Sequence, residues 1–269
     1  MTNTNISVVN GIIYSCYTRL SREGENFISF HVFTYIESGM LRINDGKNEY
    51  ELHEGDCAFY VRNRLAKFSK VPAADGTEYK SLSIRIDSNV LNDLKATYKH
   101  ILNKPVTNDA IIKLETNPLY TGFAQSLIAY LNSGAPITDA MKQLKVHEIA
   151  LLLLQSKPEL AGILLDISEP GKIDLKDFMQ HNFRFNVSLE RFAYLTGRSL
   201  STFKRDFEKL FGTTPSRWLQ QKRLDEALYL ITQKGTKVSD VYIEVGFENL
   251  SHFSFAFKKA FGKAPTQIG

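Results

Sequence analysis

The sequence predicts a two-domain α+β protein, with a β-rich first part and an all-α second part. Its 269 residues are enough for two ordinary domains. Short apolar and aromatic runs separated by turn residues fill residues 6–87, a pattern typical of strands in a small barrel or sandwich. From residue 88 on, the apolar period becomes helical. We therefore expect a β-barrel with flanking helices, followed by a helical domain.

The strand-like runs are bounded by residues that favour turns. Asn44-Asp45-Gly46 is a good hairpin former, and His53 to Asp56 is a second turn signal. The expected strands lie within residues 12–14, 27–36, 39–43, 50–52, 58–61 and 82–86.

Three amphipathic stretches are expected to be helices, at residues 89–100, 118–132 and 138–154. Their apolar faces fit either packing on the barrel or a dimer seam, and the sequence does not separate these options. The polar segment 166–174, which contains Pro170-Gly171, is the expected interdomain linker. We expect a sensing and dimerisation domain at 1–166, a linker at 167–174 and a helical domain at 175–269.

The helical domain contains an internal repeat. Three phenylalanines, a glycine and a proline recur at a shift of 50 residues; they are Phe203, Phe207, Phe211, Gly212 and Pro215, then Phe253, Phe257, Phe261, Gly262 and Pro265. An earlier glycine recurs at a shift of 49, as Gly197 and Gly246. A repeat this regular indicates two copies of one supersecondary unit.

The spacing within each copy predicts a helix-turn-helix. Phenylalanines at i, i+4 and i+8 form one buried stripe, and the glycine that follows them is a helix C-cap candidate. The earlier glycine ends a short helix in a tight turn. The N-cap candidates are Ser199 or Ser201 in the first copy and Asn249 or Ser251 in the second. A helix from Pro215 to about Thr232 joins the copies as a spacer.

Positive charge is concentrated in this helical part. From residue 168 on, the chain holds 16 Lys and Arg against 11 Asp and Glu, whereas the residues before it hold 17 against 18. Such an excess fits contact with phosphate, although many solvated surfaces carry one.

Residues 170–268 resemble the AraC/XylS family of bacterial regulators. The resemblance rests on the two repeats and on Leu189, Ala193, Leu219, Arg223-Leu224 and Ala227. It implies two helix-turn-helix units that bind double-stranded DNA in successive major-groove turns, roughly 34 Å apart on one face. The first part is similar, more loosely, to the cupin-like arm and barrel of the same family, through Gly39-x-Leu-x-Ile43, Tyr50 and Gly55-Asp56. There the resemblance implies sensing of a small-molecule effector or regulatory protein, homodimerisation and contact with RNA polymerase.

The family pattern assigns the base-reading residues. They are Ser201, Thr202, Lys204 and Arg205 in the first copy, and Leu250, Ser251, His252 and Phe255 in the second. Arg205 suits bidentate contact with guanine, although Lys204 and Arg205 also fit solvated or phosphate-contacting roles. Phe255 stands where the family commonly has arginine, and Tyr242 stands where the first copy has Ala193. We expect Tyr242 to push its helices apart or turn outward, and the first copy to set most of the base specificity.

Other polar and basic residues are expected to contact DNA phosphates. They are Arg198, Ser199, Lys209, Arg217, Lys222, Lys258 and Lys259, with Lys263 close by. Arg223 fits either a phosphate contact or a pair with Asp225 or Glu226.

Two alternatives to a regulator remain. A cupin-like barrel suggests a small-molecule-binding protein or metal enzyme with an accessory DNA-binding domain. The barrel region, however, holds only His31 and His53, too few for a typical ligand set. We expect no enzyme activity, no metal and no cofactor. An architectural DNA protein would not need the first 160 residues.

Membrane and redox signals are weak. No apolar run reaches the roughly 18 residues of a membrane span, and residues 1–10 do not resemble a signal peptide, so we expect a cytoplasmic protein. Cys16 and Cys57 are expected to be buried free thiols.

Overall fold

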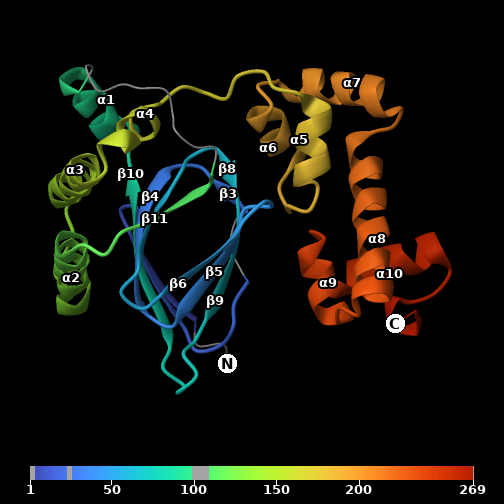
Figure 1. Ribbon diagram of the computed structural model, residues 1–269, viewed down its shortest axis with the longest axis horizontal. Helices are drawn as coiled ribbons and strands as arrows, with labels where there is room; N and C mark the ends of the chain where they lie inside the picture. Colours follow the sequence, from blue (N-terminus) through green and yellow to red (C-terminus); the bar gives the residue numbers. More distant parts are fainter. Residues whose placement is uncertain (1–3, 23–25, 99–108, 269) are drawn as a thin grey trace. The chain divides into compact units, whose positions relative to one another are not determined.

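The computed structural model describes residues 4–22, 26–98 and 109–268. It divides into two compact units, formed mainly by the residues up to Ser168 and by those from Glu169 on. The first unit combines strands and helices, and the second is helical (Figure 1). The coarse prediction of a mixed chain with a helical second part is confirmed.

The described strands of the first unit form three sheets, and the ladders of the two larger sheets are antiparallel. The largest has the order β1-β2-β10-β4-β7-β11, a second has the order β6-β5-β9, and β3 pairs with β8. The bounds are β1 Thr4–Val9, β2 Ile12–Tyr17, β3 Phe27–Ile28, β4 His31–Ser38, β5 Met40–Asn44, β6 Glu49–His53, β7 Cys57–Tyr60, β8 Arg64–Leu65, β9 Lys67–Val71, β10 Tyr79–Ile86 and β11 Ile111–Leu114.

This arrangement corrects the expected barrel. Within the described residues, the strand ladders form three separate sheets rather than one closed ring. The predicted hairpin at Asn44-Asp45-Gly46 is confirmed, because it joins β5 to β6 with Gly46 at φ 89°. Strand β11 lies in the region that we expected to be helical, and β1, β8 and β9 lie outside the runs that we expected to be strands.

Side chains alternate across the large sheet and build two cores. Ile36 of β4 and Tyr79 of β10 face the three-stranded sheet, where they pack with Leu41 and Ile43 of β5. The space between these two sheets is therefore filled by buried side chains. Phe33 lies three residues before Ile36 on β4 and therefore on the opposite face of the sheet. It belongs to the larger core under the helices.

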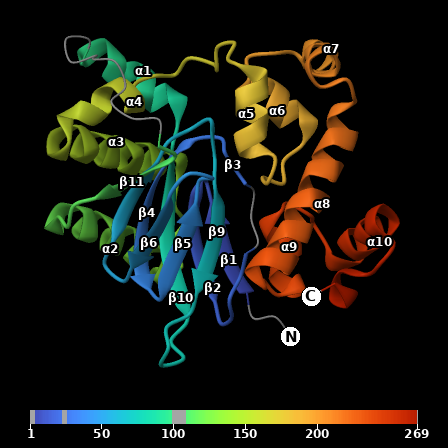
Figure 2. The same cartoon turned by 45° about the vertical axis from the view of Figure 1, so that its right-hand side comes forward.

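Helices cover that other face of the large sheet (Figure 2). Their bounds are α1 Ser88–Thr97, α2 Pro118–Ser133, α3 Asp139–Ser156 and α4 Ala161–Leu164, with a 3-10 turn at Pro158–Leu160. The three predicted stretches are thus confirmed as α1, α2 and α3, except that residues 99 and 100 lie outside the described residues. Leu144 and Leu151 of α3 stay 66% and 41% exposed.

His31 of β4 belongs to the interior of the first unit. Its ring stacks on Phe59, and its Nδ1 accepts a hydrogen bond from the backbone N–H of Arg62. Burial lowers the pKa of His31 to about 3, so the imidazole is neutral at physiological pH. Cys57 is buried and Cys16 is half-buried, and both are free thiols.

Residues 166–174 contain no helix or strand, and the helices of the second unit begin after them. Its elements are α5 Leu175–Asn182, α6 Leu189–Leu195, α7 Leu200–Phe211, α8 Pro215–Lys234, α9 Val238–Glu244, α10 Leu250–Phe261 and a 3-10 turn at Pro265–Gln267.

Candidate nucleic-acid interface

The repeat folds into two helix-turn-helix units, α6–α7 and α9–α10, as predicted. The hydroxyl of Ser199 accepts a hydrogen bond from the backbone N–H of Thr202, and the Asn249 side chain accepts one from His252. These bonds identify Ser199 and Asn249 as the two N-caps. Both second helices end at a left-handed glycine, Gly212 or Gly262, so α7 and α10 have the same length and the same type of C-cap.

The turn glycines carry a constraint that the sequence did not show. Gly197 has φ 64°, and a Cβ added there would lie 2.4 Å from the carbonyl carbon of Gly171. Gly246 has φ 93°, and its added Cβ would lie 2.6 Å from the carbonyl oxygen of Arg184. Each glycine therefore permits both a left-handed turn and close packing of backbone on backbone.

The same turn forms in both helix-turn-helix units, although Ala193 of the first copy corresponds to Tyr242 in the second. The backbone N–H of Arg198 donates to the Ala193 carbonyl at 2.9 Å, and Phe247 donates to Tyr242 at 2.8 Å. Ala193 is buried, whereas Tyr242 is half-buried at the edge of the second core. The tyrosine is accommodated by facing partly outward, one of the two outcomes that we expected.

Phenylalanine stripes hold each second helix in place. Phe203 and Phe207 of α7 are fully buried, as are Phe253 and Phe257 of α10. Trp218 at the start of α8 packs edge-on against Phe207. The third phenylalanine of each stripe, Phe211 or Phe261, is half-buried rather than buried as we expected. Because the stripe faces inward on each helix, the opposite face of α7 and of α10 is turned to solvent.

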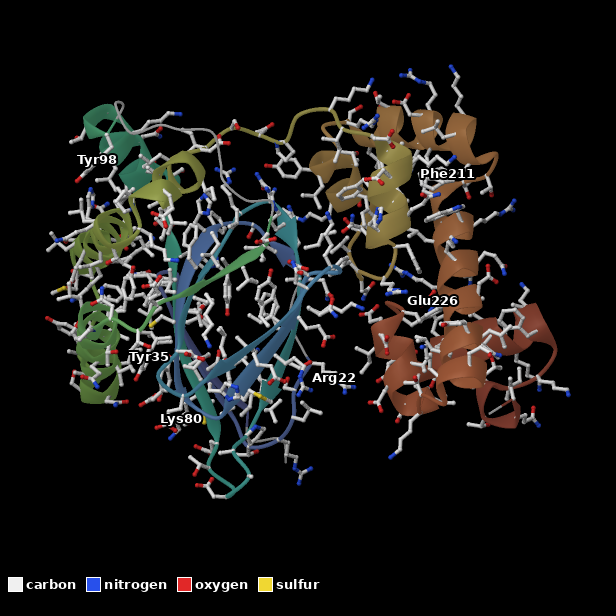
Figure 3. The ribbon with its side chains drawn as sticks, viewed as in Figure 1. Arg22, Tyr35, Lys80, Tyr98, Phe211 and Glu226 are labelled. Carbon is white, nitrogen blue, oxygen red and sulfur yellow. The ribbon has the colours of Figure 1, made fainter. Side chains whose placement is uncertain are left out.

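The spacer helix α8 is anchored by Arg223. Its guanidinium donates to the backbone carbonyls of Phe183 and Phe185, each at 2.8 Å. Burial lowers the pKa of Arg223 to about 10. Arg223 therefore pairs with neither of the acids that the sequence offered; Glu226, on α8 (Figure 3), instead forms a salt bridge with Arg184.

The outward face of α7 presents the predicted base-reading residues. Ser201, Lys204 and Arg205 are exposed, and Thr202 is half-buried beside the N-cap. The Arg205 side chain is 77% exposed, and its guanidinium lies 3.7 Å from Asp206. An exposed guanidinium on the outward face of a helix suits bidentate contact with a guanine edge.

The outward face of α10 is chemically different. Ser251 and His252 are exposed, Leu250 is 41% exposed, and Phe255 is 71% exposed. His252 packs edge-on against Phe247, with ring centroids 5.7 Å apart. The second helix thus keeps the fold of the first but presents an apolar residue where the first presents Arg205.

Most of the expected phosphate contacts lie on the surface. Ser199, Lys209, Arg217, Lys222, Lys258, Lys259 and Lys263 are exposed. Arg198 is different, because its side chain is only 7% exposed and donates to Asp206, to the Ile173 carbonyl and to the Thr196 carbonyl. These bonds leave Arg198 little surface for a phosphate and make it a link between the linker and α7. The bond from Arg198 also lowers the pKa of Asp206.

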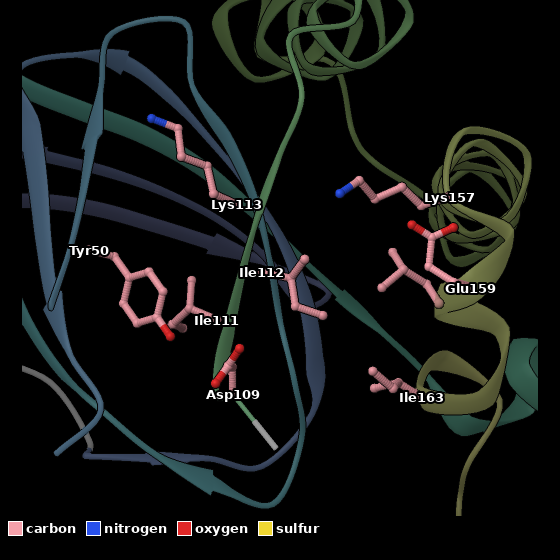
Figure 4. Close-up of a pocket in the computed structure, with 9 residues that line it drawn as sticks. Tyr50, Asp109, Ile111, Ile112, Lys113, Lys157, Glu159 and Ile163 are labelled. Atoms are coloured by element: carbon pink, nitrogen blue, oxygen red, sulfur yellow. The ribbon is translucent and has the colours of Figure 1, made fainter. Parts of the chain in front are cut away.

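The first unit has a shallow hollow of about 290 Å³ between β11 and the segment around α4 (Figure 4). Its lining combines apolar Ile111, Ile112 and Ile163 with charged Lys113 and Lys157. Ile111 and Tyr50, which line it, also belong to or pack against the core between the two sheets. Among the described residues, no group of three or more His, Cys, Asp and Glu side chains is arranged to hold a metal ion.

Comparison with known proteins agrees with this organisation. Residues 192–268 match the helix-turn-helix domain family, and residues 31–163 match the ExsA N-terminal regulatory domain. The chain is 24% identical over 231 residues to the virulence regulon transcriptional activator VirF of Yersinia enterocolitica, covering 85% of each chain. It is 25% identical over 242 residues to the transcriptional regulator ExsA of Pseudomonas aeruginosa, covering 88% of this chain and 84% of ExsA. Among solved structures, an apo ToxT variant from Vibrio cholerae aligns over 96% of both chains, with 13% identity and a TM-score of 0.46.

Two capped helix-turn-helix units on a basic helical unit, behind a regulatory domain, define a DNA-binding transcriptional regulator rather than an enzyme. The chain belongs to the AraC/XylS family of such regulators. No helix in the described part of the chain is both long and apolar enough to cross a membrane.

Proposed function

We propose that this regulator activates transcription by inserting α7 and α10 into successive major-groove turns on one face of its operator. The observation that carries the proposal is the pair of helices of equal length, each with a side-chain N-cap, a glycine C-cap, buried phenylalanines on one side and an exposed outward face. Activation rather than repression is supported by VirF, which is described as a transcriptional activator.

The two helices have unequal roles in this proposal. Arg205 forms the bidentate contact with guanine, supported by Ser201, Thr202 and Lys204, so α7 sets most of the base specificity. The α10 face, with Leu250, Ser251, His252 and Phe255, mainly adds affinity. The exposed phosphate candidates named above supply a steep salt dependence. Arg198 is left out of that set, because its hydrogen bonds assign it to positioning α7.

The first unit is the proposed regulatory part. In this proposal the cupin-like sensing and dimerisation domain spans 1–166, the linker 167–174 and the DNA-binding domain 175–269. The match to the ExsA N-terminal regulatory domain supports this role. We propose that it responds to a partner protein or small molecule, and that the regulator contacts RNA polymerase in the cytoplasm. The exposed Leu144 and Leu151 lie seven residues apart on α3 and therefore on one face, which supports homodimerisation there.

Footprinting of the DNA upstream of the chain's own gene tests the proposal against an architectural role. The regulator is expected to protect a defined site of about two helical turns, and the site should persist when the salt concentration is raised enough to remove non-specific binding. Uniform coating of the DNA that disappears with salt would instead indicate an architectural protein.

A further inference from the structure

Phe255 is the most exposed large apolar residue of the second unit. Its side chain is 71% exposed, compared with 52% for Leu210 and 41% for Leu250. A phenylalanine held in water loses the favourable burial that the other ring side chains of α10 obtain. Its exposure therefore needs an explanation beyond the packing of this unit.

The geometry of α10 places Phe255 at the centre of the outward face. Buried Phe253 and Phe257 are each two residues away, slightly more than half a turn of helix, so Phe255 points away from the core. Ser251 and Lys259 lie four residues on either side and share its face. Arg205 has the same place on α7, between Ser201 and Lys209.

The charges around Phe255 favour a polyanionic partner over a protein core. Helix α10 contains no Asp or Glu, and Lys258 and Lys259 lie in its last turn. Apart from Phe255, the central face offers Ser251 and the His252 imidazole, which packs against Phe247. An apolar ring bordered by cations matches the floor of a major groove bordered by phosphates, where the C5-methyl group of thymine is the main apolar feature.

We propose that Phe255 reads thymine: its ring contacts the C5-methyl group of one or two thymines in the half-site occupied by α10. This inference rests on the proposed docking of both helices in the major groove. It adds a modest apolar preference on the α10 side to the guanine contact of Arg205. The operator is then asymmetric, with a required guanine and, about one helical turn away, a preferred thymine.

The expected effect of one methyl group is small but measurable. Burying a group of about that size against an apolar surface changes a binding constant about fourfold. Uracil differs from thymine only by this methyl and keeps the same base pairing, so a thymine-to-uracil exchange isolates the contact.

The test uses the full-length protein and a duplex selected by it from a pool of random sequence. Each thymine of that duplex is replaced by uracil in turn, and dissociation constants are measured for the wild type, Phe255→Ala and Leu210→Ala. Leu210→Ala is the matched control, because it removes an exposed apolar side chain from α7, next to the buried stripe. Phe255→Leu is included because it retains an apolar contact.

In the wild type and in Leu210→Ala, uracil at one or two positions about one turn from the required guanine should weaken binding about fourfold. Phe255→Ala should bind the thymine and uracil duplexes equally, and Phe255→Leu should keep part of the difference. The inference is overturned if no uracil weakens wild-type binding, or if Phe255→Ala keeps the full difference. It is also overturned if Phe255→Ala loses only activation by RNA polymerase, which would indicate a protein-docking face. Selection of no preferred sequence at all would instead refute the proposed function.

Discussion

Replacing Arg223 by methionine removes the two hydrogen bonds that join α8 to the backbone before α6. The aliphatic stem is largely retained, but the carbonyls of Phe183 and Phe185 lose their donor. A hydrogen bond from a charged group contributes about 1.5–3 kcal/mol. Arg223 is not fully buried, so water can replace part of these hydrogen bonds in the variant. We therefore take the lower limit of about 1.5 kcal/mol for each of the two bonds and expect the free energy of unfolding to fall by about 3 kcal/mol.

Urea denaturation followed by tryptophan fluorescence measures this loss. Trp218 is the single tryptophan of the chain and packs against Phe183, so its emission reports on the core that Arg223 supports. Lys222→Met is the matched control, because Lys222 is exposed and expected at a phosphate. That variant should keep its stability and lower the salt slope of DNA binding by about one. The reasoning is refuted if Arg223→Met unfolds at the wild-type urea concentration, or if it lowers the salt slope as Lys222→Met does.

Three further predictions concern stability and assembly. Because burial lowers the pKa of His31 to about 3, the unfolded chain takes up this proton first as pH falls below 6.5. Between pH 7.5 and pH 5.5 the free energy of unfolding, measured by urea denaturation, should therefore decrease by about 1.4 kcal/mol more in the wild type than in His31→Gln. Gly197→Ala should cost several times the roughly 1–2 kcal/mol of Gly212→Ala. The two glycines have nearly equal φ, 64° and 67°, but only the first packs on backbone, and equal thermal shifts would disprove this. The double variant Leu144→Asp with Leu151→Asp should sediment as a monomer where the wild type sediments as a dimer. A double variant that remains dimeric would show that α3 is not the interface.

The helical unit was predictable because the residues that begin and end its helices recur in both copies of the repeat. The glycines after Phe211 and Phe261 became the C-caps of α7 and α10, and the spacer began at Pro215 as expected. Local signals are enough here, because caps and buried stripes depend on residues within one or two turns of helix.

Features that depend on distant partners were not predictable. The four residues Ile111–Leu114 are too short to show a period of two, and they form β11 only because they pair with β7. The sequence predicts Arg198 to be a phosphate contact. Its side chain is instead held in the protein by hydrogen bonds to Asp206 and to the Ile173 carbonyl, eight and 25 residues away. Arg223 likewise finds carbonyls 40 and 38 residues earlier in the chain, which no local pattern indicates.

The most direct test of unequal reading is a scan of every single base-pair change in the operator, measured with the wild type, Arg205→Ala, Ser251→Ala and His252→Ala. We predict that Arg205→Ala loses about 1–3 kcal/mol of discrimination at one base pair, while Ser251→Ala and His252→Ala each lose clearly less. Equal losses at Ser251 or His252, or a uniform drop in affinity for Arg205→Ala, would contradict the claim that the first helix sets most of the specificity.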